Sequence, residues 1–194
     1  MRLMLICCEG KTEKLYFDIL AQRVLRLPGF FNIEIIGERG QHRALIGRTV
    51  EERRRLAEEY DVDEASVESW AVCDDDGMRC SYAELLSYAE AYDVGLAFSR
   101  PQFESYLLQH FEQSKAVKKG ELFAALSRHR RRVDGKDYNE KTKADLEWLE
   151  AVLVDKPKLV QMAVVNADQR SLQSTSPFLT VQRLTERLLN LQRW

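Results

Sequence analysis

The sequence predicts an α/β protein with a mainly parallel, four-stranded sheet flanked by helices and a helical C-terminal extension. Three observations lead to this fold class. Short apolar runs alternate with helix-like stretches over residues 1–112, as in strand–helix–strand units with right-handed crossovers. After about residue 112 the strand-like runs stop and amphipathic patterns continue. The 194 residues are 45% hydrophobic and 31% charged, an ordinary globular balance.

The first part of the chain is expected to contain all four strands. Residues 2–8 form a short apolar run that ends at Glu9-Gly10, as a buried parallel strand would. Similar patterns predict strands at residues 31–36, 69–73 and 94–98, and helices follow at residues 44–60, at 81–92 and from Thr12 to Pro28. Ser81 and Glu84 form the S-x-x-E pattern of a capping box. Pro101 suits the first position of a further helix.

The second part of the chain is expected to be helical. Helices are predicted at residues 118–131, 141–154 and 156–167, and a last helix opens at Ser176-Pro177 and ends near Leu191. Residues 135–139 and 168–175 are expected to be loops. We therefore divide the chain into a domain over residues 1–112 and a helical region over residues 113–194 that packs on it.

Composition limits where the protein acts. No apolar run approaches the ~20 residues of a membrane span, so we expect a cytoplasmic protein without membrane contact. Cys7 and Cys8 are adjacent in a predicted strand and would point to opposite faces, and there is no C-x-x-C pattern. The four cysteines are therefore expected to be reduced thiols rather than zinc ligands or a disulfide framework.

The charge is unevenly distributed along the chain, although the net charge is only -2. Residues 51–93 contain 14 acidic and 4 basic residues, whereas residues 115–143 contain 10 basic and 4 acidic ones. An acidic lobe followed by a basic lobe suits a site that holds cations beside a polyanion. Two solvated helical faces are the simpler alternative.

Acidic residues stand at the ends of two predicted strands. Glu9 follows the first strand, and Asp74 and Asp76 follow the third. In open α/β sheets the carboxyl ends of the strands meet at one edge, where such folds place their chemistry. Three carboxylates at one place would repel, and a hard divalent cation such as Mg²⁺ or Mn²⁺ would relieve that repulsion. Strand-end acids can also be simple helix caps.

Three motifs in this order resemble a known family. They are Cys8-Glu9-Gly10-Lys11-Thr12-Glu13 with Tyr16-Phe17, the Asp74-Asp75-Asp76 turn, and the run FSRPQFESYLLQHF at residues 98–111. They are similar to the CEGxTExxYF, DxD and SxPxFExWLLxHF patterns of the RloB/AbiLii family. More broadly, the Glu-Gly and Asp-x-Asp turns resemble the Toprim domain. The resemblance covers residues 1–112 well and the final helix more loosely.

The resemblance implies a Toprim-like, metal-dependent nuclease, generally encoded beside an ABC/OLD-type ATPase in antiphage or abortive-infection loci. Glu9 takes the position of the Toprim glutamate, and Asp74 and Asp76 take the DxD positions. Two departures stand out: Tyr106 replaces the usual Trp, and Asp75 adds a third acid to the turn. The extra aspartate leaves open which pair of acids faces the metal.

Several residues have candidate catalytic roles beside simpler alternatives. Glu9, Asp74 and Asp76 would hold the ion, and Glu9 could instead act as a general acid or base. Lys11 could stabilise charge on the reacting phosphate or remain a solvated lysine. Glu104 could be a second-metal or outer-sphere acid or a helix N-terminal charge.

Candidate contacts to the nucleic-acid backbone are basic or hydroxyl side chains, which would bind without sequence specificity. They are Arg39, His42, Arg43, Ser99, Arg128, Arg130, Arg131 and Arg132; Ser99 could instead cap a helix. The leading hypothesis is cleavage of RNA, with tRNA as one target, or of DNA, by an effector that works with a partner ATPase. The alternative is a non-catalytic subunit that docks onto and regulates the ATPase, and self-association stays open.

Overall fold

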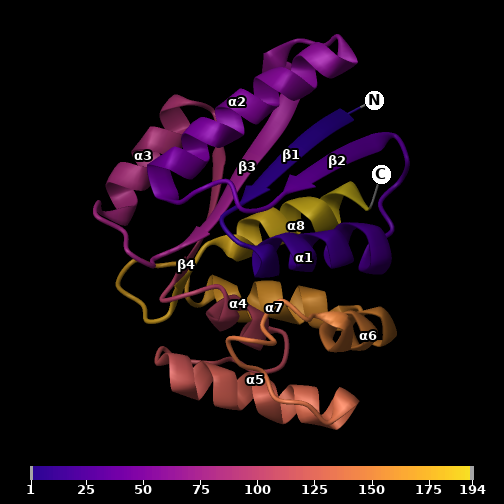
Figure 1. Ribbon diagram of the computed structural model, residues 1–194, viewed down its shortest axis with the longest axis vertical. Coiled ribbons are helices and arrows are strands. Elements are labelled where there is room, and N and C mark those ends of the chain that lie inside the picture. The colour runs from indigo at the N-terminus through magenta and orange to yellow at the C-terminus, as the bar shows by residue number, and fades with distance from the viewer. Residues whose placement is uncertain (1, 193–194) are drawn as a thin grey trace.

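Five strands form one sheet in the order β2-β1-β3-β4-β5 (Figure 1). The computed structural model describes residues 2–192. The strands are β1 (Arg2–Cys8), β2 (Phe31–Ile36), β3 (Val67–Asp74), β4 (Gly95–Arg100) and β5 (Phe178–Leu179). The first four run parallel and β5 is antiparallel to β4. The predicted α/β class and mainly parallel sheet are confirmed, and the sheet has five strands instead of four.

Eight α-helices surround this sheet in the described part of the chain. They are α1 (Lys11–Asp18), α2 (His42–Tyr60), α3 (Tyr82–Ala91), α4 (Glu104–Gln109), α5 (Lys119–Asp134), α6 (Glu147–Asp155), α7 (Lys158–Asp168) and α8 (Val181–Leu191). A π-helical segment (Ile19–Val24) continues α1, and a short 3-10 turn (Glu64–Ser66) precedes β3. The capping box of α3 is confirmed: Ser81 and Glu84 bond to each other's backbone N–H groups.

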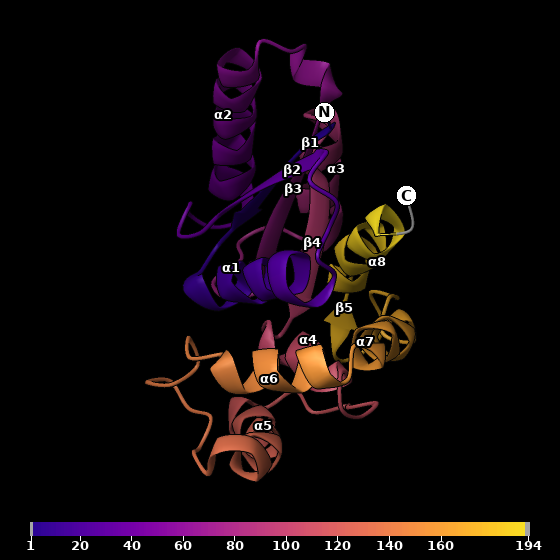
Figure 2. The same cartoon turned by 90° about the vertical axis from the view of Figure 1, so that its right-hand side faces the viewer.

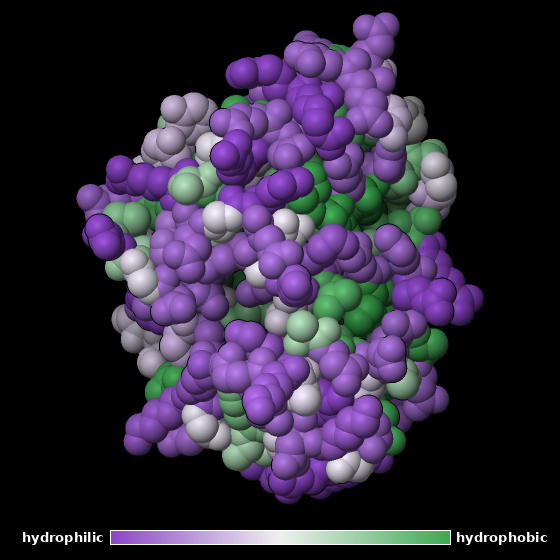
Figure 3. Space-filling view, viewed as in Figure 1, coloured by the Kyte–Doolittle hydropathy of each residue, from purple (hydrophilic) through white to green (hydrophobic). Residues whose placement is uncertain are grey.

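The two faces of the sheet have separate hydrophobic cores. Helices α2 and α3 cover one face, and α1, α4 and α8 lie on the other with α6 and α7 packed behind. Figure 2 shows α2 and α8 on opposite sides of the strands. Strand β1 is buried on both faces from Leu3 to Cys8, which explains its continuous apolar sequence. Figure 3 shows an outer surface that is mainly hydrophilic, with a few small apolar patches.

The C-terminal region is joined to the sheet as well as packed on it. Strand β5 pairs with β4, the Thr180 N–H donates to the Phe98 carbonyl at 2.8 Å, and the Phe98 N–H donates to Thr180 Oγ1 at 2.9 Å. Helix α5 lies farthest from the sheet in both ribbon views. The sequence missed β5 because two residues are too short for a period-2 pattern to show.

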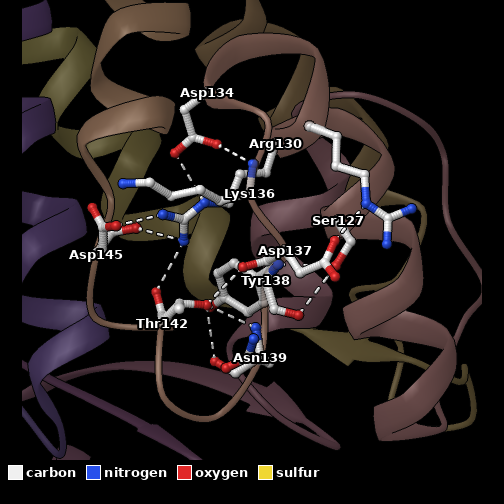
Figure 4. A network of polar contacts seen from close by, with 10 residues as sticks. Ser127, Arg130, Asp134, Lys136, Asp137, Tyr138, Asn139, Thr142 and Asp145 are labelled. Atoms are coloured by element: carbon white, nitrogen blue, oxygen red, sulfur yellow. Dashed lines mark hydrogen bonds and ion pairs between the residues drawn. The ribbon is translucent and has the colours of Figure 1, made fainter.

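The predicted helix at residues 141–154 is correct only in its second half, since α6 begins at Glu147. Residues 135–146 instead form a loop that is tied to α5. The buried Arg130 side chain donates to the carbonyls of Thr142 and Asp145 and pairs with the Asp134 and Asp145 carboxylates (Figure 4). These bonds hold the loop in an irregular path. Helix α4 likewise starts at Glu104, later than the expected Pro101.

None of the helices in residues 2–192 combines the length and apolar character that a membrane crossing needs. The four cysteines are free thiols; Cys7, Cys8 and Cys73 are buried and Cys80 is partly exposed.

Candidate functional site

The ends of β1 and β3 bring Glu9 beside Asp74. The two strands are paired up to Cys8 and Val72, and the Glu9 N–H donates to the Val72 carbonyl at 2.9 Å. The Asp74 N–H lies 3.4 Å from Glu9 Oε2, and Gln41 Nε2 donates to Glu9 Oε1 at 2.8 Å. The sequence predicted that these two acids would lie close together, and the parallel pairing of β1 with β3 brings them together.

The three aspartates of the turn have different surroundings. Asp75 forms an ion pair with Arg100, at 3.2 Å between Oδ2 and Nε, at the end of β4. The side chain of Asp76 is exposed, and its backbone N–H donates to Asp74 Oδ1 at 3.0 Å. Asp74 is thus the aspartate beside Glu9 and accepts a hydrogen bond from the Asp76 backbone, whereas the Asp75 side chain pairs with Arg100.

Two further carboxylates reach the same edge from helices. Glu13 in α1 and Glu104 in α4 are 7% and 6% exposed. The carboxylate of Glu13 approaches the backbone at Gly10 closely, since a Cβ at that position would lie 2.8 Å from Glu13 Oε2. Glu104 Oε1 accepts a hydrogen bond from the Tyr138 hydroxyl at 3.0 Å. The burial of Glu13 beside other acids was not visible from the spacing of residues in the sequence.

Burial raises the pKa of all four carboxyl groups, and neighbouring acidic charges add to the effect. Burial raises the pKa of Glu9 to about 7, and the charge of Asp74 adds to the effect. Burial also raises the pKa of Glu13 to about 7, helped by the charges of Asp74, Glu104 and Glu9. The pKa values of Asp74 and Glu104 are raised as well, mainly by burial. Such a cluster favours bound protons or a cation at neutral pH.

A pocket of about 360 Å³ opens beside this cluster. Its acidic side includes Asp74, Asp75, Asp76 and Glu104, and its other side includes Lys119 and Lys143 from the C-terminal region. The charge of Lys143 acts against the raised pKa of Asp74 and of Glu104. The sequence showed only that residues 115–143 are basic and did not place these two lysines at the site. Lys143 in particular was assigned to a predicted helix.

A second, more open pocket of about 820 Å³ lies on the other side of the acidic turn. Predicted residues His42 and Arg43 line it together with Arg79, which sequence reasoning missed. His42 Nε2 lies 3.0 Å from the Asp74 carbonyl oxygen, and the Arg43 guanidinium stands 5.3 Å from the centre of the Tyr88 ring. Gly77 borders both pockets, so basic residues flank the acidic turn on two sides.

Four other predicted residues pair with carboxylates outside the cluster. Lys11 pairs with Glu38 at 3.8 Å, and Arg39 pairs with Glu52 at 3.5 Å. On α5, Arg128 lies 4.0 Å from Glu112, Arg131 pairs with Asp137, and Arg132 is exposed.

Two of the predicted nucleic-acid contacts are corrected by burial. The Arg130 side chain has no exposed surface and is used inside the protein (Figure 4), so it does not belong to a basic surface. Ser99 is fully buried where β5 pairs with β4, opposite Leu179, and it neither faces solvent nor caps α4. The missed fifth strand is the reason for the second error.

The donor set suits a hard cation. Mg²⁺ is usually bound through one or two carboxylates plus water and phosphate oxygens, and Glu9 and Asp74 could supply that number of carboxylates, although the bond between them joins the Glu9 carboxylate to the Asp74 backbone N–H. In residues 2–192, no three His, Cys, Asp or Glu side chains are arranged to hold a metal ion by themselves.

The fold and this edge define an α/β protein with clustered carboxylates at the carboxyl ends of a parallel sheet. A family model described as RloB-like protein matches residues 4–188, so the chain belongs to the RloB-like family. Neither the curated proteins nor the solved structures contain a match to the chain.

Proposed function

We propose that the chain is a Toprim-type, Mg²⁺- or Mn²⁺-dependent nuclease that hydrolyses phosphodiester bonds of RNA, with tRNA as one candidate, or of DNA. The contact of Glu9 with Asp74 carries this proposal, because it unites acids from two strand ends that also define the resemblance to Toprim domains. Their raised pKa values support a cation as the missing counter-charge.

The roles follow from the positions of the side chains. Glu9 and Asp74, with the neighbouring Asp76, would hold a divalent ion, and such an ion would supply polarisation of the scissile phosphate and activation of a water molecule. Gln41 orients Glu9 through its amide, and His42 holds the turn at the Asp74 carbonyl. Glu9, with a pKa of about 7, is also able to exchange a proton near neutral pH, as a general acid or base would.

The proposed biological setting rests on family membership. The RloB/AbiLii resemblance supports an effector of an antiphage or abortive-infection system that acts with an ABC/OLD-type ATPase. Basic residues on both sides of the acidic turn are consistent with a polyanionic substrate.

A cleavage assay tests the activity. Labelled tRNA, single-stranded DNA and duplex DNA are incubated with the purified chain in Mg²⁺, Mn²⁺ or EDTA. We expect cleavage only with metal, and its loss in Glu9→Gln and Asp74→Asn but not in Glu58→Gln, an exposed control on α2. Cleavage that persists in EDTA or in both site variants contradicts the proposal. If there is no cleavage even with the partner ATPase, the non-catalytic regulatory subunit is favoured.

A further inference from the structure

The pocket of about 360 Å³ is built jointly by the sheet and the C-terminal region. The Asp74–Asp76 turn and Glu104 come from the sheet side, whereas Lys119, Glu140 and Lys143 come from α5 and the loop that follows it. A substrate phosphate held by the carboxylate edge would therefore have two lysines across the pocket.

The two lysines share one intramolecular counter-ion. Glu140 pairs with Lys119 through Oε1 and with Lys143 through Oε2, the latter at 3.1 Å. All three side chains are about half exposed, so these ion pairs contribute little stability and an entering anion can replace the carboxylate. Glu140 thus occupies a position between two ammonium groups that suits a phosphate.

The backbone of Lys143 is fastened to the carboxylate cluster. Its carbonyl lies 3.5 Å from Thr12 Oγ1 and 3.4 Å from the hydroxyl oxygen of Tyr138, whose single hydrogen is shared with the nearer Glu104 Oε1 at 3.0 Å. The Arg130 network holds the same loop from the side of α5 (Figure 4). Lys143 is therefore presented to the pocket from a fixed position rather than from a free loop.

We propose that Lys119 and Lys143 form a binding subsite for a phosphate of the nucleic-acid backbone, next to the carboxylates, with Glu140 as the group that the phosphate displaces. The proposal deepens the proposed function, because it assigns the substrate contact of the same site to the C-terminal region.

Binding measurements test the subsite separately from catalysis. Fluorescence anisotropy follows a short labelled single-stranded RNA, and DNA of the same sequence, in EDTA and in Ca²⁺. One lost phosphate contact lowers the salt slope by about 0.7 and the affinity by about fourfold near 0.15 M salt. We expect these changes for Lys119→Gln and Lys143→Gln, and tighter binding for Glu140→Gln. Lys156→Gln, an exposed lysine between α6 and α7, is the matched control.

Each outcome decides a separate question. If Lys119→Gln and Lys143→Gln bind like Lys156→Gln, or if the unmodified protein binds neither probe, the subsite is refuted. If the lysine variants bind more weakly but no cleavage is found in the assay above, the subsite stands and the nuclease proposal fails. Circular dichroism of every variant excludes unfolding as the cause.

Discussion

Replacing Glu13 with glutamine removes a carboxylate that the fold holds almost out of contact with water. Its pKa is about 7, raised by burial and by the charges of Asp74, Glu104 and Glu9, whereas an ordinary glutamate titrates near 4.5. Between these two values the folded state binds more protons than the unfolded state, so stability falls as pH rises. The difference between the two pKa values corresponds to roughly 3 kcal/mol of folding stability, and the protein has lost all of it above about pH 7.

Urea unfolding of the metal-free protein in EDTA measures this effect. Because both states of Glu13 are protonated below about pH 4.5, the wild type and Glu13→Gln should have similar free energies of unfolding there. Near pH 8 the variant should be more stable by up to about 3 kcal/mol, whereas the exposed Glu58→Gln should follow the wild type. A Glu13→Gln profile that runs parallel to the wild-type profile between these pH values would refute the reasoning.

Three further predictions concern stability and use the same urea assay. Arg130→Met should lower the free energy of unfolding by about 3 kcal/mol or more, because the buried groups that Arg130 bonds are left without a partner. The exposed Arg131→Met should lower it by under ~1 kcal/mol, and equal losses for the two variants would contradict this prediction. Gly95→Ala should cost about 1–3 kcal/mol, because its Cβ would lie 2.6 Å from the Trp70 ring, and a neutral result would show that the ring moves freely. Ser81→Ala should cost about 1 kcal/mol through the lost cap of α3, and no loss would mean that the capping box is not stabilising.

Most of the sheet could be predicted from local patterns. Residues 2–8 form the continuous apolar run of a buried parallel strand, whereas residues 31–36 mix apolar and polar side chains, as expected for the half-buried edge strand β2; both strands have the predicted bounds. The pattern is lost where contacts distant in sequence decide the structure. Strand β5 exists because Phe178 and Thr180 pack and bond at β4, and two residues carry no period of their own.

The site was predictable to the extent that it follows from strand topology. Glu9 and Asp74 end neighbouring parallel strands, so their meeting required only the order of the strands. The different surroundings of the three aspartates were not predictable, since Asp75 is drawn away by Arg100 at the end of another strand. The burial of Glu13 and Glu104 depends on how two helices sit on the sheet.

The amino-acid sequence by itself determined the class of fold, the strand-end acids and the family, because these depend on short-range patterns and ordered motifs. Only the tertiary structure decided which basic residues serve the pocket. Arg130, in the most basic run of the chain, is buried, whereas Lys143 lines the pocket beside the carboxylates. The reason is that a buried guanidinium must satisfy its donors within the protein, and the carbonyls that do so fold residues 135–146 into the loop that carries Lys143.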